Sequence, residues 1–236
     1  MFQTVNDVQG YCQDNGIKMI DFKMIDINGR WRHITIPFQR LTNDTLIYGI
    51  GFDGSNYGYA QVEKSDMVFI PTLQTATIDP FLATPTLTMT GDVCVIEQPD
   101  NRPFDQYPRN VARRAIDYMN EQGIADQMII GPEFEFHLFD QVNFEVQPNR
   151  VAYAVDTAQA IWNAGNQNIS NKGYQVPPKS GYHVAAPQDI TFDLRSQICL
   201  LLEQWGVKVK YHHHEVGGSG QVEIETELGD MLTMAD

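Results

Sequence analysis

Apolar and polar residues alternate in short runs over the first hundred positions, which is the pattern of β-strands with one buried face. Residues 18–27 and 30–36 are two such runs, and Asn28-Gly29 between them is the strongest short signal for a β-hairpin. A short capped helix is expected before the hairpin. Further strands are expected at residues 67–70, 75–78 and 87–96. The pattern predicts a small mixed sheet with one helix.

Apolar residues recur at helical spacing in two later stretches. Pro108 opens the first helix and Gly123 ends it, and the second helix spans residues 192–205. The polar segment 97–107 contains two prolines and is predicted to be a linker. The chain is therefore predicted to have two domains, 1–104 and 105–236. Residues 150–180 show no sustained period and are predicted to form a long loop.

The strand predicted at residues 133–139 carries two acidic residues on one face. Because side chains alternate between the faces of a strand, Glu133 and Glu135 point the same way and lie about 7 Å apart. In a strand this apolar, unpaired buried carboxylates would cost several kcal/mol. We favour a cation site over a solvated face for these two residues.

A second β-hairpin is predicted over residues 209–227, around a Gly-Gly-Ser-Gly turn. If its centre lies near Ser219, Glu215 faces Glu223 directly, with Cβ atoms about 5 Å apart. Facing carboxylates repel, so a hard divalent cation such as Mg²⁺ or Mn²⁺ is expected between them. The alternative is a solvent-exposed hairpin with scattered acids.

The residues His212, His213 and His214 must point to both faces of their strand in turn. The sequence leaves open whether they are ligands, phosphate partners or packed core imidazoles. Farther towards the N-terminus, glycines surround Asp53 and permit tight turns. Asp53 is either a functional carboxylate or part of an ordinary surface turn.

Composition narrows the classes of function. With 236 residues and 42% hydrophobic residues, the chain can bury a sizeable core, whereas its formal net charge of −14 argues against a nucleic-acid partner. The N-terminus lacks a signal pattern and no apolar run reaches the length of a membrane span. A cytoplasmic protein with no membrane partner is expected. The three cysteines are expected to be reduced and buried.

Six motifs in this order resemble the type I glutamine synthetases over essentially the whole chain: FDGSN, KSDMVFIP, IDPF, YPRNVARRA, GPEFEFHLF and HHHEVGGSGQVE. The resemblance implies an α+β fold, with an N-terminal β-grasp domain followed by the first part of a catalytic domain that has an antiparallel sheet and flanking helices. It implies an ATP-dependent glutamate–ammonia ligase that forms glutamine through γ-glutamyl phosphate. ATP would be a co-substrate, glutamate and ammonium the other substrates, and Mg²⁺ or Mn²⁺ the cofactor.

The resemblance also implies roles for five residues. Glu135, Glu215 and Glu223 match the glutamates that hold the first metal, and Glu133 matches a ligand of the second. Asp53 matches the aspartate that binds and deprotonates ammonium in a neighbouring subunit's site. The implied partners are copies of this chain or of a full-length homologue, as a dodecamer. No nucleotide-binding residue is identified.

The chain departs from the family pattern in two residues and in length. Lys210 stands where a glutamate near the nucleotide is usual, and Asn56 replaces the second serine of a DGSS loop. The chain also looks truncated, being about half the expected length, so we expect it to be inactive alone. Two alternatives stay open, namely a γ-glutamyl ligase that acts on another amine and a non-catalytic remnant that binds metal or takes part in assembly.

Overall fold

The computed structural model describes residues 2–97, 100–163 and 173–235. The chain forms two compact units, of which unit 1 comprises residues 1–128 and 230–236, and unit 2 comprises residues 129–229. The helix that begins at Pro108 therefore belongs to unit 1. The domain division at residue 105 rests on a change in composition, and it stays a prediction.

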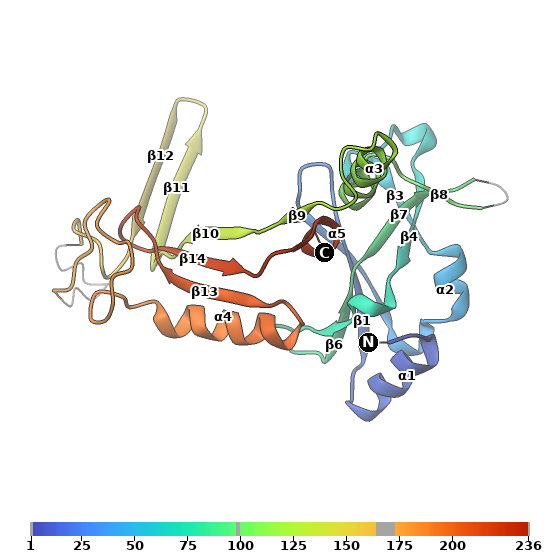
Figure 1. Ribbon diagram of the computed structural model, residues 1–236, viewed down its shortest axis with the longest axis horizontal. Coiled ribbons are helices and arrows are strands. Elements are labelled where there is room, and N and C mark those ends of the chain that lie inside the picture. Colours follow the sequence, from blue (N-terminus) through green and yellow to red (C-terminus); the bar gives the residue numbers. More distant parts are fainter. Residues whose placement is uncertain (1, 98–99, 164–172, 236) are drawn as a thin grey trace. The chain divides into compact units, whose positions relative to one another are not determined.

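The helices and strands of unit 1 lie in the blue-to-green part of Figure 1 and at the C-terminal end. They are α1 (Val5–Asp14), β1 (Met19–Ile25), β2 (Trp31–Pro37), α2 (Asn43–Tyr48), β3 (Ile50–Asp53), β4 (Asp66–Pro71), β5 (Thr77–Ile78), β6 (Thr86–Met89), β7 (Gly91–Val95), β8 (Arg102–Pro103), α3 (Pro108–Glu121) and α5 (Met231–Ala235). Short 3₁₀ turns occur at Phe38–Arg40, Gly54–Tyr57, Val62–Lys64 and Leu73–Thr75.

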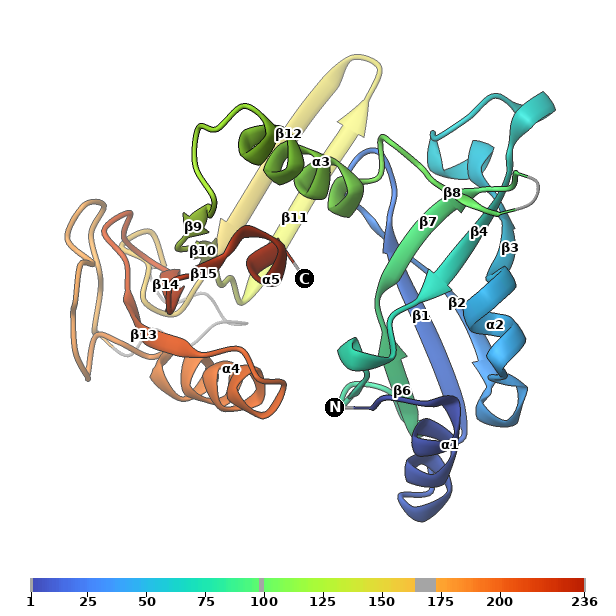
Figure 2. The same ribbon diagram turned by 45° about the vertical axis from the view of Figure 1, so that its right-hand side comes forward.

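Strand β1 lies at the centre of the first sheet of unit 1, which has the order β2-β1-β6-β5. It pairs antiparallel with β2 and parallel with β6 (Figure 2). The β1–β2 turn closes where Gly29 takes a φ of 77° and its N–H donates to the carbonyl of Asp26 at 2.9 Å. The predicted Asn28-Gly29 hairpin is confirmed. A mixed sheet is also present, but the strand expected at residues 67–70 lies in a second sheet as β4, and a second helix, α2, is added to the one predicted.

The core of unit 1 lies between this sheet and a second one with the order β3-β4-β7-β8. The rings of Phe22 and Phe69 meet there with centroids 5.7 Å apart, and Cys12 and Val8 of α1 are fully buried. Such packing of apolar side chains from two sheets and a helix removes apolar surface from water, which is the main stabilising contribution.

Two predicted segments of unit 1 are more structured than the sequence suggests. The strand expected at residues 87–96 breaks at Thr90 into β6 and β7, which belong to different sheets, because the Thr90 N–H bonds the Thr75 hydroxyl at 2.9 Å. The predicted linker 97–107 contains β8 and the buried Tyr107. Residues 98–99 of that linker lie outside the described part of the chain.

The elements of unit 2 are β9 (Ile129–Ile130), β10 (Glu133–His137), β11 (Gln141–Gln147), β12 (Arg150–Asp156), α4 (Phe192–Gln204), β13 (Val209–His214) and β14 (Gln221–Thr226), and β15 (Gly229–Asp230) leads back to unit 1. Strands β10, β14 and β13 form an antiparallel sheet in that order. Helix α4 packs along β13, as Figure 1 shows. Even-numbered residues of the sheet form the face towards α4, because His212 contacts Phe192, with ring centroids 5.5 Å apart, and also contacts Arg195 of this helix.

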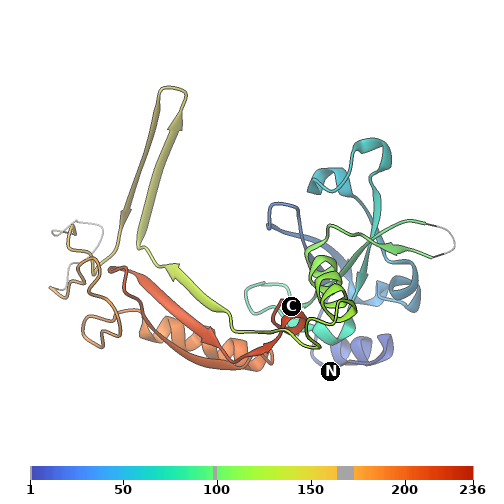
Figure 3. The same ribbon diagram turned by 45° about the horizontal axis from the view of Figure 1, so that its top comes forward.

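A second hairpin, β11–β12, occupies part of the region that was expected to be a loop. Its strands pair from Gln141 opposite Asp156 to Gln147 opposite Arg150 (Figure 3). The prediction of a loop from residue 150 was wrong up to residue 156, because apolar residues alternate on both sides of the Pro148-Asn149 turn. Residues 164–172 of the predicted loop lie outside the described residues. One face of this hairpin is apolar and exposed, and it includes Phe144 at 79% and Tyr153 at 81% exposure.

Candidate functional site

One face of the β10-β14-β13 sheet is lined by carboxylates. Glu133 lies directly opposite Glu225, and Glu135 lies directly opposite Glu223, which in turn lies opposite His213 on the other side. All five residues have odd numbers, so they share the face that points away from α4, which we call the carboxylate face. The predicted common face for Glu133 and Glu135 is present. Both of these side chains are exposed.

Glu215 joins this cluster from the end of β13, at a different register from the one predicted. The sequence places it directly opposite Glu223, whereas the structure puts His213 opposite Glu223. The Glu215 N–H bonds the Gln221 carbonyl at 2.9 Å, two residues nearer the turn. A shift of two residues keeps every side chain on its original face, so Glu215 and Glu223 still lie close together.

The register shift follows from how the glycine-rich loop closes. Gly218 and Gly220 take φ values of 110° and 80°, which side chains disfavour. The Gln221 side-chain carbonyl accepts the Gly217 N–H, and the Gln221 N–H bonds the Gly218 carbonyl at 3.1 Å. The hairpin is therefore centred on Gly218 instead of Ser219, and side-chain capping of this kind leaves no periodic signal in the sequence.

The two buried carboxyl groups at the centre of the cluster are short of positive charge. Glu215 and Glu223 are each 6% exposed, and Glu215 Oε2 has no hydrogen-bond partner among the described residues. Burial raises the pKa of Glu223, and the neighbouring carboxyl groups of Glu215 and Glu135 raise this pKa further, against the opposing effect of His213. Clustered carboxylate oxygens of this kind suit a hard divalent cation.

The three histidines divide as strand alternation requires. His214 is fully buried and its Nε2 donates to the Gln159 side-chain carbonyl at 2.7 Å, and His212 Nδ1 accepts from Arg195 Nε at 3.1 Å. Both are packed structural imidazoles. His213 instead lies on the carboxylate face, with Nδ1 3.4 Å from Glu215 Oε2 and Nε2 3.6 Å from Glu223 Oε2.

Glu225 was missed as a site residue by the sequence reasoning. Ligand atoms of His213, Glu223 and Glu225 all lie within 4.8 Å of one another, a spacing that could hold a metal ion. Glu225 also forms an ion pair with Lys210 at 2.8 Å. The signal was present, because Glu223 and Glu225 are two positions apart in a strand and must share a face.

Asp53 ends β3 in unit 1, and its carboxylate is held by the loop that follows. Its Oδ1 accepts from the Ser55 N–H at 2.9 Å and the Ser55 hydroxyl at 2.6 Å, and its Oδ2 accepts from the Asn56 side chain at 3.0 Å. Hydrogen bonds from the Ser55 and Ser65 hydroxyls and from the Ser55 N–H lower the pKa of Asp53. Asn56, which departs from the family pattern, thus helps to orient the exposed carboxylate. The role that the resemblance gives Asp53, in the site of a neighbouring subunit, stays a prediction.

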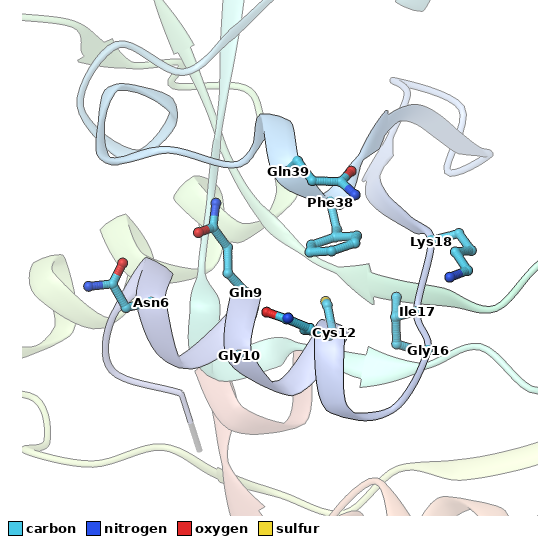
Figure 4. A pocket seen from close by; sticks show the side chains of 10 residues that line it. Asn6, Gln9, Gly10, Cys12, Gly16, Ile17, Lys18, Phe38 and Gln39 are labelled. Carbon is cyan, nitrogen blue, oxygen red and sulfur yellow. The ribbon is translucent and has the colours of Figure 1, made fainter.

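A hollow of about 640 Å³ lies beside α1 in unit 1 (Figure 4). It is lined mainly by uncharged residues, including Gln9, Cys12 and Phe38, together with Lys18. Burial raises the pKa of Cys12 to about 11, so its thiol is protonated and unreactive at neutral pH. This hollow is therefore a weaker candidate for chemistry than the carboxylate face.

Across the described residues, no helix has the length and apolarity needed to cross a membrane.

Comparison with protein families gives two matches that together span most of the chain. The family described as "Glutamine synthetase, beta-Grasp domain" matches residues 16–96, and the one described as "Glutamine synthetase, catalytic domain" matches residues 105–236. The second match alone covers more than half of the chain.

Among similar proteins, a glutamine synthetase of Vibrio cholerae is 38% identical over 99% of this chain and 50% of its own length. A 3-hydroxylaminophenol mutase of Cupriavidus pinatubonensis is also 38% identical, over 100% of this chain and 50% of its own length. The structure of the Plasmodium falciparum glutamine synthetase superposes with a TM-score of 0.81 at 22% identity, over 100% of this chain and 46% of that one. The chain thus spans about half the length of the curated relatives that it matches.

Proposed function

Because this chain belongs to the glutamine synthetase family, we propose that it is part of an ATP-dependent glutamate–ammonia ligase that forms glutamine through γ-glutamyl phosphate. The observation that carries the proposal is the pair Glu215 and Glu223, two buried carboxyl groups that lie close together, of which Glu215 has an oxygen without a hydrogen-bond partner among the described residues. The β-grasp fold of unit 1 and the antiparallel sheet of unit 2 agree with this family.

In this proposal the carboxylate face holds Mg²⁺ or Mn²⁺. Such a cation, when bound, neutralises the oxygens of the phosphoryl group that ATP transfers to glutamate and keeps the reacting oxygens in line. Glu135, Glu215 and Glu223 are the proposed ligands of the first cation. Glu133 is a proposed ligand of a second cation, and its exposed carboxylate is open to bound water as well.

Asp53 is proposed to bind ammonium for the site of a neighbouring subunit. Its lowered pKa keeps it ionised at neutral pH, which favours attraction of a cation. A carboxylate of low pKa is a weak base, so we expect it to orient ammonium and to accept its proton only as the nitrogen attacks. The exposure of Asp53 at the end of β3 supports a role outside its own core.

The proposal includes assembly with copies of this chain or of a full-length homologue, as a dodecamer, and a cytoplasmic location. The exposed apolar face of β11–β12 supports association, because monomeric proteins rarely expose such surfaces. The three cysteines are free thiols, which agrees with a reducing compartment. Sedimentation of the purified chain, compared with a Phe144→Glu variant, tests whether this face mediates assembly. Identical sedimentation of the two would exclude that role.

Cation binding is the first test of the proposed site. Titration of the 236-residue chain with Mn²⁺ should show a site that Glu223→Gln weakens at least tenfold, because a buried ligand charge is lost. Glu227→Gln is the matched control, since it removes an exposed carboxylate just beyond β14. Equal affinity in Glu223→Gln and the unmodified chain would refute the metal assignment.

Activity is the second test. We propose that the 236-residue chain alone forms no measurable glutamine, since it spans about half the length of its relatives and Glu133 is its one proposed ligand for a second cation. The assay contains ATP, glutamate, ammonium and Mg²⁺ or Mn²⁺, with other small amines in parallel. Turnover abolished by Glu223→Gln would contradict inactivity, and preference for another amine would favour the alternative ligase. A metal-binding chain that assembles but never turns over would support the non-catalytic alternative.

A further inference from the structure

Lys210 reaches the carboxylate face because of an irregularity in β13. Pairing with β14 passes from Val209 opposite Thr226 to Tyr211 opposite Glu225, which leaves Lys210 as an extra residue. Such a β-bulge redirects a side chain. In a regular strand Lys210 would point to the opposite face from Tyr211 and away from Glu225. The bulge instead allows its ammonium to lie 2.8 Å from Glu225 Oε2 and 3.3 Å from the Tyr211 hydroxyl.

Glu225 is otherwise placed as a cation ligand. It lies directly opposite Glu133, and its oxygen belongs to the cluster with His213 and Glu223. Next to that cluster, the nine-tenths buried carboxyl of Glu215 directs an oxygen without a hydrogen-bond partner to within 3.4 Å of His213 Nδ1. Glu225 differs from these neighbours because Lys210 already balances its charge. The Lys210 ammonium also lies over the ring of Tyr211, 4.6 Å from the ring centroid.

We propose that Lys210 is a resident cation that binds Glu225 and thereby blocks a divalent-cation position formed by His213, Glu223 and Glu225, and so restricts strands β13 and β14 to one tightly bound metal ion. The inference rests on the proposed function, because it assumes that Glu135, Glu215 and Glu223 hold the first cation. It adds that the bulge in β13 sets the number of metal ions bound there.

Two effects of Lys210 oppose a second metal ion at this position. Its ammonium takes up the Glu225 oxygen that the ion would use, and its positive charge repels a divalent ion nearby. Replacement by an uncharged residue removes both effects at once. We therefore expect a second ion to bind at least about tenfold more tightly, a factor that corresponds to about 1.4 kcal/mol.

The test is Mn²⁺ stoichiometry and affinity, measured by calorimetry and by electron paramagnetic resonance on the 236-residue chain. The unmodified chain should bind one ion tightly in this sheet. Lys210→Met and Lys210→Gln should each gain a second ion, Lys210→Arg should not, and Lys210→Met with Glu225→Gln should lose the gain. Lys208→Met is the matched control, because it removes an exposed lysine two positions away. Circular dichroism confirms that each variant is folded.

The outcomes separate this inference from the proposed function. If the unmodified chain binds no ion, the metal site itself is refuted. If it binds one ion that Glu223→Gln weakens, but neither Lys210→Met nor Lys210→Gln gains a second, only the role of Lys210 is overturned. An equal gain in Lys208→Met would also overturn it, since the effect would then be one of overall charge.

Discussion

Arg195 is a fully buried charged side chain whose guanidinium is held on several sides. Two of its nitrogens bond the two oxygens of Asp189 at 2.9 and 2.6 Å, and its Nε donates to His212. The fork of the guanidinium matches a carboxylate in this way, and it fixes the strand that carries the histidines against α4.

Replacement of Arg195 by leucine should therefore destabilise unit 2 by about 3–5 kcal/mol, because it leaves the Asp189 charge buried without a positive charge beside it. Urea unfolding followed by circular dichroism measures the loss. The double variant Asp189→Asn, Arg195→Leu should lose less than Arg195→Leu alone. A larger loss in the double variant would show that packing, and not the unpaired charge, sets the cost.

Because of the same ion pair, the free energy of unfolding should depend on pH in the acidic range. Burial opposes ionisation of Asp189, but the hydrogen bonds from Arg195 and the Thr191 N–H outweigh it and lower the pKa of Asp189 below its usual value. The folded state therefore binds fewer protons than the unfolded state, and the stabilisation is present above about pH 4 and is lost as the pH falls through the folded-state pKa. Unfolding free energies measured from pH 5 downwards should fall less steeply in Asp189→Asn, whereas Asp193→Asn, at an exposed position of α4, should keep the original slope.

At the scale of elements, the loop between β13 and β14 determines where Glu215 and Glu223 lie. Gly220 has a φ of 80°, and a Cβ added there would lie 2.3 Å from the Leu138 carbonyl oxygen. Gly206, after α4, has a φ of 88° but open space around it. Alanine at Gly206 would therefore introduce backbone strain alone, whereas alanine at Gly220 would introduce both strain and a steric clash.

Gly206→Ala should cost about 1–2 kcal/mol, which is the strain of the left-handed backbone. Gly220→Ala should cost more and should also weaken Mn²⁺ binding, because the contact with Leu138 displaces the loop that carries Glu215. Thermal unfolding and Mn²⁺ titration of both variants measure these effects. Equal losses of stability, with unchanged Mn²⁺ affinity, would contradict a role for the loop in placing the carboxylates.

How far the sequence predicts the fold depends on the range of the interactions. Strand alternation predicts the common face of Glu133 and Glu135, and Asn28-Gly29 predicts the first hairpin, because both are local effects. The register of Glu215 against Glu223 depends on the Gln221 side chain that closes the loop. The bulge that redirects Lys210 likewise depends on pairing with a second strand, and neither effect has a periodic signature in one sequence.

At the scale of the whole molecule, the proposed cation ligands Glu133, Glu135, Glu215 and Glu223 all lie in unit 2. A ligand that binds only the folded state adds about 2.7 kcal/mol at a concentration one hundred times its Kd. Saturating Mn²⁺ should therefore raise hydrogen-exchange protection in β13 and β14 by up to this amount, and leave β1 and β2 in unit 1 unchanged. Mass spectrometry of peptides from both units measures the difference. Equal protection of both units would imply that they open together.

The buried cysteines give each unit a built-in probe of local unfolding. Cys12 and Cys94 lie in unit 1 and Cys199 lies in unit 2, and all three are at most 9% exposed. Burial raises the pKa of each thiol, so an alkylating reagent meets neither an accessible sulfur nor a thiolate until the surrounding structure opens. The rate at which each cysteine is alkylated should therefore record the opening of its own unit, without a probe having to be introduced into the chain.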